Sequence, residues 1–157
     1  MPVSPEEFRV ALGHFASAVT VVTTRLDDGN PAGITVTAFS SLSLEPPLVV
    51  VCIDRGAWLH DRLPIGKHFA VNMLSEEQEV ISRLFASSQR DPFRGIGFDD
   101  GRFGSPLLHD TMANLECQIV DRVAGGDHTI VVGQVESAQV TERKPLLYFR
   151  GGYTRMV

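Results

Sequence analysis

The alternation of apolar and polar positions along the chain predicts more strands than helices. Runs rich in β-branched and apolar residues, which are typical of strands, occupy residues 18–24, 33–39, 47–53, 68–74, 113–122, 129–140 and 146–150. The run at 47–53 has no strongly polar position. We therefore expect that strand to be buried on both faces.

Two segments carry helix-start signals. Ser4 and Glu7 form a possible capping box with Pro5 between them, and this pattern predicts a helix from there to about Ser17. Its apolar face would consist of Phe8, Leu12, Phe15 and Val19. A second capping box begins at Ser75 and predicts a helix to about residue 86, with an inner face of Val80, Ile81, Leu84 and Phe85. A short helix is expected around residues 58–63.

The ratio and order of these elements indicate a mainly β fold. Several strands follow one another with short turns, which favours an antiparallel barrel over a doubly wound sheet that alternates strand and helix. Barrel closure would also remove exposed sheet edges. Residues 89–106 contain four glycines and are expected to form an ordered surface loop between elements.

Composition narrows the class of protein. The length of 157 residues favours a single domain over 1–157, and 43% hydrophobic with 21% charged residues is typical of globular chains. A net charge of -5 argues against a general nucleic-acid binder. The apolar runs are shorter than a membrane span needs, so neither nucleic acid nor membrane is an expected partner.

Cysteine use and the first residues predict the compartment. Cys52 and Cys117 lie in apolar and alternating runs and are expected to be buried thiols, which suits a reducing cytoplasm. The sequence begins without the basic and apolar regions of a signal peptide. We therefore expect a cytoplasmic location.

Familiar catalytic motifs are missing from the sequence. Gly95-Ile96-Gly97 lacks both the third glycine and the preceding strand of a dinucleotide fingerprint, and there is no P-loop. The five histidines are scattered without metal-ligand spacing, so no metal site is expected. A Ser-His-Asp hydrolase is unsupported because no G-x-S-x-G elbow is present.

Two polar stretches remain as candidate binding elements. Thr35 and Thr37 share one strand face, with Ile34, Val36 and Ala38 on the other, and the polar stretch continues to Ser41 beside an apolar strand. It reads either as a connection or as the edge of a site for a flat polar ligand. His128 follows a Gly-Asp turn at a barrel mouth, and it is either a surface residue or a ligand contact.

Six segments in this order resemble one family. They are FASAVTVVTT (15–24), GITVTAFSSLSLEPP (33–47), FAVNMLS (69–75), LFA (84–86), GDHT (126–129) and PLLYF (145–149). Together they resemble the short-chain flavin reductases, the reductase components of two-component flavin-dependent monooxygenases. The resemblance implies a homodimeric split β-barrel of Greek-key type with two to three flanking helices. It also implies that FMN or FAD is reduced by NADH or NADPH and supplied to a partner monooxygenase.

The resemblance also implies roles for particular residues. His128 would be the catalytic residue, near the nicotinamide, and Tyr153 would lie close to the other nicotinamide contacts. The flavin ring and ribityl chain would be bordered by Thr35, Val36, Thr37, Ala38, Phe39, Ser40 and Ser41. The ribityl chain and phosphate would follow Cys52, Ile53, Asp54 and Arg55, and the phosphate end would be closed by Arg83, Phe85 and Ala86.

One departure from the family pattern bears on the phosphate site. Relatives often carry Ser or Lys where this chain has Gly56-Ala57-Trp58, so phosphate binding would depend on Arg55, Arg83 and backbone amides. Trp58 would either pack against the fold or stack on an adenine. Two other functions stay open: a flavin- or haem-binding protein without enzymatic activity, and a flavoprotein that reduces another acceptor such as ferric chelates or cobalamin.

Overall fold

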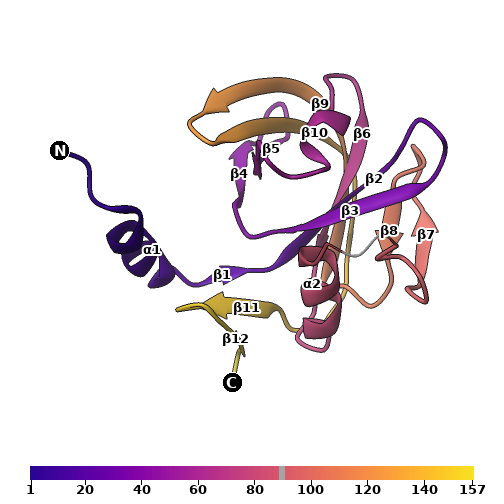
Figure 1. The fold of residues 1–157 in the computed structure, drawn as a ribbon. Helices are drawn as coiled ribbons and strands as arrows, with labels where there is room; N and C mark the ends of the chain where they lie inside the picture. Colours follow the sequence, from indigo (N-terminus) through magenta and orange to yellow (C-terminus); the bar gives the residue numbers. More distant parts are fainter. Residues whose placement is uncertain (89–90) are drawn as a thin grey trace.

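The computed structural model describes residues 1–88 and 91–157 (Figure 1). In chain order its elements are α1 (Pro5–Gly13), β1 (Ser17–Ala18), β2 (Thr20–Arg25), β3 (Pro31–Val36), β4 (Phe39–Ser43), β5 (Leu48–Asp54), the 3₁₀ turn η1 (His60–Arg62), β6 (His68–Met73), α2 (Glu79–Ala86), β7 (Phe98–Asp100), β8 (Pro106–Leu108), β9 (Ala113–Gly125), β10 (His128–Val140), β11 (Leu146–Phe149) and β12 (Gly152–Arg155). The mainly β architecture expected from the sequence is confirmed.

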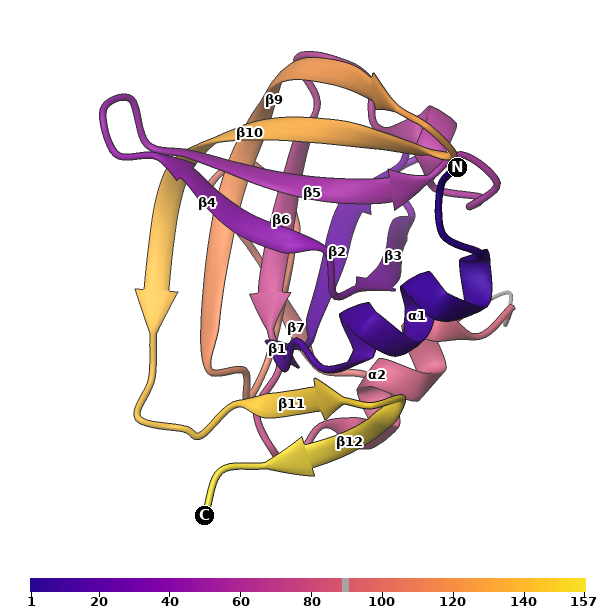
Figure 2. The ribbon, with the colours of Figure 1, turned by 90° about the vertical axis from the view of Figure 1, so that its left-hand side faces the viewer.

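Seven strands form one curved antiparallel sheet in the order β3-β2-β6-β9-β10-β5-β4. Figure 2 shows the sheet curling, with β4 and β5 crossing one side and β2 and β3 on the other. The end strands β3 and β4 follow each other in the chain but do not pair, so hydrogen bonding does not close the expected barrel. The sheet therefore keeps two edges, which meet at the connection between β3 and β4.

Two apolar clusters hold the sheet in place. The first fills the curl and includes Val22, Val51 and Phe69, together with Leu59 and Leu63 from the connection between β5 and β6. The second lies between the sheet, α2 and β11, and its members include Val19, Val21, Leu74, Phe85, Phe93 and Leu146. Neighbouring side chains of β2 thus belong to different clusters, so β2 is buried on both faces.

The prediction that β5 is buried on both faces was wrong. Its burial alternates: Val49, Val51 and Ile53 are buried, whereas Leu48, Val50 and Cys52 are only half-buried. Among the described strands of the seven-stranded sheet, β2 and β6 are buried on both faces, because they lie between the two clusters. Apolar content alone does not tell which strand has a second layer against it.

The first helix begins as predicted but is shorter. Ser4 accepts from the backbone of Glu7 and the Glu7 side chain accepts from the Ser4 backbone, which forms the expected capping box. The helix ends at Gly13 instead of Ser17 because residues 17–18 pair with β11. Three residues of its predicted apolar face, Phe8, Leu12 and Phe15, are exposed, and α1 projects from the body in Figure 1. The fourth, Val19, lies beyond the helix and is buried in the second cluster.

The second helix begins at Glu79, later than predicted. The Ser75 backbone N–H donates to Gln78 Oε1 at 3.0 Å, which is half of the expected capping box, but Ser75 forms an isolated bridge with Pro145 instead of starting the helix. The inner face contains buried Phe85 as expected, whereas Val80 is exposed. The short helix expected around 58–63 is present as η1.

Two other boundaries differ from the pattern. The strand predicted at 33–39 is divided, since β3 ends at Val36 and β4 begins at Phe39. The loop predicted at 89–106 includes residues 89 and 90, which lie outside the described residues, and the remainder contains β7 paired with β8 as a small hairpin. No helix in the described residues is long and apolar enough to cross a membrane.

Candidate functional site

His128 lies where the ends of two long strands meet. It is the first residue of β10 and pairs with Asp54, the last residue of β5. The preceding turn needs the left-handed conformation at Gly126, where φ is 67°. The His128 Nδ1 atom is 2.7 Å from Asp127 Oδ1, and 40% of the imidazole side chain is exposed. Asp127 therefore holds one side of the ring, and Nε2 has no hydrogen-bond partner among the described residues.

The hydrogen bond between His128 and Asp127 changes the pKa of the Asp127 carboxyl. Together with the charge of the imidazole, it lowers the pKa of Asp127 below its ordinary value. The Asp127 carboxylate therefore accepts a hydrogen bond from Nδ1 of the imidazole. This contact sets the orientation of the imidazole ring.

Arg55 joins the end of β5 to the same turn. Its backbone N–H donates to the Asp127 carbonyl at 3.0 Å, and its guanidinium Nη1 donates to the Gly126 carbonyl at 3.3 Å. Asp54 Oδ1 accepts from the backbone N–H of Gly56 at 2.7 Å. The side chains of Asp54 and Arg55 are exposed, so the predicted residues Asp54, Arg55 and His128 are brought together at one surface.

The start of β4 is tied to β5 and open on its other side. The Cys52 backbone N–H donates to the Ala38 carbonyl at 2.9 Å, and the Phe39 N–H donates to the Thr37 carbonyl at 2.9 Å. Thr37, Ala38, Ser40 and Ser41 are all exposed. Because β4 is the last strand of its sheet, its free edge presents backbone donors and acceptors to a ligand.

A second polar group joins β3, α2 and β12. The Thr35 hydroxyl donates to the Ser82 carbonyl at 2.6 Å, and the Ser82 hydroxyl is 2.7 Å from the Tyr153 hydroxyl. The Arg83 guanidinium lies 4.8 Å from the centroid of the Tyr153 ring and also pairs with Glu79 at 3.3 Å. The predicted residues Thr35, Arg83 and Tyr153 thus form one group, although the Thr35 hydroxyl already has a protein partner.

Some predicted site residues direct their side chains into the apolar clusters. Val36 and Ile53 belong to the first cluster and Phe85 to the second, where its ring meets Phe93 edge-on at 4.9 Å between centroids. Strand alternation sends the side chains of Val36 and Ile53 inward, so these two residues offer a ligand only their backbone, and Phe85 lies on the buried face of α2. Cys52 and Phe39 are half-buried, and Ala86 is exposed. Ala38 is exposed while Val36 is buried, so the chain bend separates two residues expected on one face.

Residues 12–156 match the family model described as flavin reductase like domain. The chain belongs to the flavin reductase-like family. The family expected from the sequence, with its oxidoreductase class, is therefore confirmed.

Individual relatives of this flavin reductase-like chain agree with the match. A reductase subunit, HsaB, of a flavin-dependent monooxygenase from Rhodococcus jostii is 39% identical over 153 residues, covering 97% of this chain and 78% of the relative. NADH:FAD oxidoreductase SgcE6 from Streptomyces globisporus, solved with NAD and FAD fragments, is 36% identical with a TM-score of 0.92. The match covers 100% of this chain and 97% of the SgcE6 chain. The nitrilotriacetate monooxygenase component B homologue from Mycobacterium thermoresistibile is 37% identical with a TM-score of 0.93. The match covers 97% of this chain and 86% of that structure's chain.

The donor set of this flavin reductase-like chain fits a flavin. An isoalloxazine ring has a polar edge of carbonyl and ring-nitrogen atoms, and the free edge of β4 with the Ser40 and Ser41 hydroxyls matches that chemistry. A flavin phosphate needs cationic or backbone donors, which Arg55 and Arg83 provide. Hollows of about 510 Å³ and about 300 Å³ lie elsewhere, beside the β7–β8 hairpin. The candidate site is accordingly an open sheet edge on the single chain.

The sequence did not predict roles for two residues of the candidate site in this flavin reductase-like chain. Ser82 connects β3 to β12 and is fully buried, and Asp127 orients His128. The spacing of Gln78, Ser82 and Phe85 puts them on one helical face, and the structure shows all three buried, but the polar side chains of the first two did not mark that face in the sequence. No periodic signal marks Asp127, which also suits an ordinary turn.

Proposed function

We propose that this protein transfers a hydride from NADH or NADPH to FMN or FAD and supplies the reduced flavin to a partner monooxygenase. The observation that carries the proposal is the junction of β5 and β10, where His128, held by Asp127, stands beside the exposed Asp54 and Arg55. This junction continues into the free edge of β4 through the Cys52–Ala38 hydrogen bond. Membership of the flavin reductase-like family supports the same activity.

The flavin supplies the redox chemistry when it is bound, because its N5 atom accepts the hydride from nicotinamide C4. The protein supplies binding and orientation. Backbone groups of β4 and the hydroxyls of Ser40 and Ser41 hold the polar edge of the ring. Arg55 and Arg83 attract phosphate groups. His128 presents Nε2 to the carboxamide of the nicotinamide, as an acceptor when the ring is neutral and as a donor when it is protonated.

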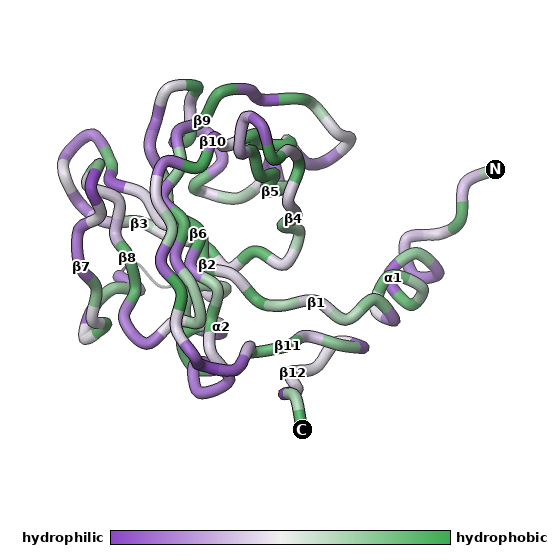
Figure 3. Tube along the Cα trace, turned by 180° about the vertical axis from the view of Figure 1, so that it is seen from behind, coloured by the Kyte–Doolittle hydropathy of each residue, from purple (hydrophilic) through white to green (hydrophobic). Residues whose placement is uncertain are grey.

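We also propose that the protein acts as a homodimer. Helix α1 has no buried residue, and its apolar side chains, including Phe8, Val10 and Leu12, are exposed together with Phe15 beyond its end. Figure 3 shows hydrophobic residues, in green, along part of α1, which stands apart from the sheet. Exposed apolar surface of this kind is typical of a protein–protein contact, and a second copy of the chain is the partner that the family resemblance implies.

The cytoplasm is the compartment we infer for this activity. Cys52 and Cys117 are both free thiols, as expected for a chain that works where disulfides do not persist. Reduced nicotinamide cofactors are consumed in that compartment.

Nicotinamide oxidation with purified protein tests the proposed function. We expect NADH or NADPH to be consumed only when FMN or FAD is present, and addition of a ferric chelate or cobalamin alone to leave the rate at background. No consumption with either flavin would overturn the proposal. Consumption that needs cobalamin or a ferric chelate instead of free flavin would favour the alternative acceptor function.

A further inference from the structure

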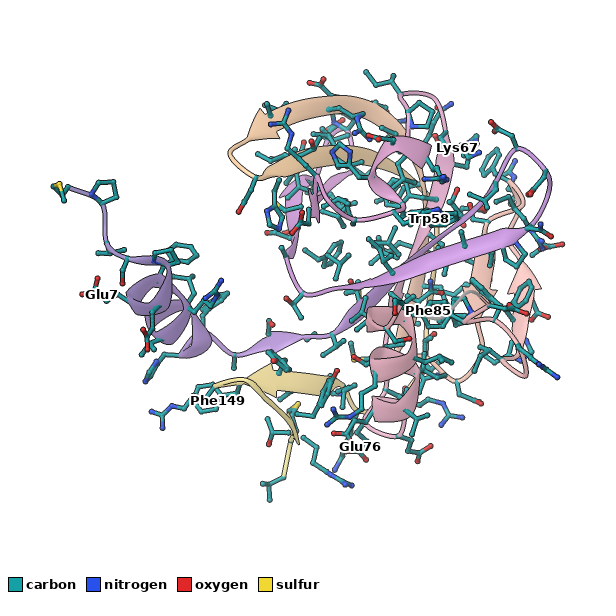
Figure 4. The ribbon with its side chains drawn as sticks, viewed as in Figure 1. Glu7, Trp58, Lys67, Glu76, Phe85 and Phe149 are labelled. Atoms are coloured by element: carbon teal, nitrogen blue, oxygen red, sulfur yellow. The ribbon has the colours of Figure 1, made fainter. Side chains whose placement is uncertain are left out.

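Trp58 is an exposed aromatic side chain next to the candidate site. It lies on the connection between β5 and β6, four positions after Asp54, and the residue is 56% exposed. The Arg62 guanidinium lies 4.0 Å from the centroid of the indole ring, and Arg62 Nη1 donates to the Trp58 carbonyl at 2.5 Å. Figure 4 shows Trp58 in the body of the molecule, on the opposite side of the view from Glu7 of α1.

Packing does not account for this tryptophan. The connection is anchored by Leu59 and Leu63, which are fully buried in the first apolar cluster. It is also held by His60, whose Nε2 atom lies 2.7 Å from the Thr129 hydroxyl, and by Arg122, which donates to the His60 and Leu63 carbonyls. These contacts fix the backbone of the connection without the indole. Trp58 is therefore an outward aromatic plane on a rigid support.

The charges around Trp58 favour an anionic ligand. Arg55 and Arg62 are both exposed, and the guanidinium of each donates to a backbone carbonyl. Arg62 also lies over the indole ring, and the hydrogen bond with His60, helped by the charge of Arg62, lowers the pKa of the neighbouring Asp61. The nearby carboxylates are already engaged, Asp54 with the Gly56 N–H and Asp61 with His60. An aromatic plane with the Arg62 guanidinium over it and Arg55 three residues earlier in the chain suits a heteroaromatic base that carries a diphosphate.

We propose that Trp58 and Arg62 form a subsite for the adenosine diphosphate half of FAD, in which the adenine stacks on the indole and Arg55 and Arg62 face the diphosphate. The proposal rests on the proposed function, because it extends the flavin site beyond the end of β5. It predicts that this chain binds FAD more tightly than FMN. NADH carries the same adenosine diphosphate group, so the test separates the two sources.

Flavin affinity of three variants provides the first test. Trp58→Ala is expected to raise the Kd for FAD about tenfold, the effect of losing one base–aromatic stack, while the Kd for FMN changes less than about twofold. Trp58→Phe keeps an aromatic plane and should retain most of the FAD affinity. Ile65→Ala, an exposed residue in the next part of the same connection, is the matched control and should change neither Kd. The KM for NADH measured with FMN should be the same in Trp58→Ala as in the wild type.

The outcomes separate this subsite from the proposed function. Equal loss of FMN and FAD affinity, or no loss of either, would overturn the subsite while flavin reduction by the wild type stands. A raised KM for NADH with unchanged FAD affinity would overturn the assignment to FAD. Failure of the wild type to reduce either flavin would overturn the proposed function itself.

Tryptophan fluorescence provides a direct second readout, since Trp58 is the only tryptophan in the chain. ADP contains the proposed group without a flavin, so it should displace FAD and quench the indole emission in the same concentration range. Ribose 5-phosphate should do neither. Displacement of FAD by ADP with unchanged emission, or no displacement at all, would overturn the subsite.

Discussion

At the scale of single residues, the site depends on how His128 is held. Its Nδ1 atom is occupied by Asp127 at 2.7 Å, and 40% of the side chain faces outward. Asp127 itself is exposed, so the contact orients the ring more than it stabilises the fold. The consequence of losing this imidazole should therefore appear in ligand binding.

We expect His128→Ala to raise the KM for NADH about three- to tenfold, the cost of roughly one lost hydrogen bond, with little change in flavin Kd. Steady-state kinetics and flavin titration measure the two quantities. His109→Ala is the matched control, because His109 is also exposed and lies 3.2 Å from Asp99, away from the site. Wild-type NADH kinetics in His128→Ala would remove this residue from the nicotinamide site.

Cys117 provides a prediction about pH and stability. Burial raises the pKa of its thiol from 9.0 to about 12, with smaller effects of Glu116 and Glu136. The folded protein therefore keeps a neutral thiol that the unfolded chain ionises from about pH 9 upward. This contribution is complete below pH 9 and is lost progressively between about pH 9 and about pH 12.

Denaturant unfolding at several pH values measures this effect. The free energy of unfolding of the wild type should fall more steeply above pH 9 than that of Cys117→Ala, which has no thiol to ionise. Parallel slopes in the two proteins would show that the thiol is not held neutral.

The family resemblance predicted part of the candidate site, whereas residue types alone left the role of His128 open. The resemblance implied roles for His128, Arg55 and Tyr153, which the structure places in two separate polar groups. The inward direction of Val36 and Ile53 could not be derived from a motif that covers a continuous segment, whereas helical spacing did predict that Phe85 is buried. Their orientation depends on which sheet face meets a second layer.

At the scale of elements, the β9–β10 hairpin sets the shape of the sheet. Its register shifts between Val132 and Gly133 and again between Val135 and Ser137. A Cβ atom at Gly133 would lie 2.7 Å from Phe69 Cζ and 3.1 Å from Cys117 Cβ, inside the first cluster. The glycine is needed there because the Phe69 ring crosses close to the backbone.

Gly133→Ala should therefore destabilise the protein by about 1–3 kcal/mol, the usual cost of overpacking a core. Gly125→Ala in the same hairpin is the control, because a Cβ there would meet no atom closer than 3.7 Å. Thermal unfolding compares the two variants. An unchanged Tm in Gly133→Ala would mean that Phe69 moves aside without cost.

Element types were predictable where a local signal exists. The capping box at Ser4 and the β-branched strands formed as expected. The end of α1 was not predictable from its apolar spacing, because residues 17–18 pair with β11, which lies far along the chain. Likewise, the division of residues 33–39 reflects a bend between two sheet edges and leaves no mark on the apolar pattern.

At the scale of the whole molecule, α1 stands away from the sheet with its apolar face uncovered (Figure 1). The amphipathic pattern predicted an apolar face on this helix, but it does not tell what covers that face. In the proposed homodimer, the second copy covers it. Charges placed on α1 should then weaken association while the sheet remains folded.

Sedimentation equilibrium tests the assembly. The wild type should have about twice the 17.2 kDa mass of one chain, and Phe8→Glu combined with Leu12→Glu should shift it toward a single chain. Val80→Glu, an exposed apolar position on α2, is the control and should leave the mass unchanged. A wild-type mass of one chain would contradict the homodimer.

The central claim, hydride transfer from a reduced nicotinamide to flavin, is tested most directly by an anaerobic titration. Flavin and protein are mixed without oxygen, NADH or NADPH is added, and the visible absorbance of the flavin is recorded. The account predicts that about one equivalent of one of these donors bleaches one flavin, because each carries two electrons. Flavin absorbance that both donors leave unchanged, in a protein that binds the flavin, would contradict it.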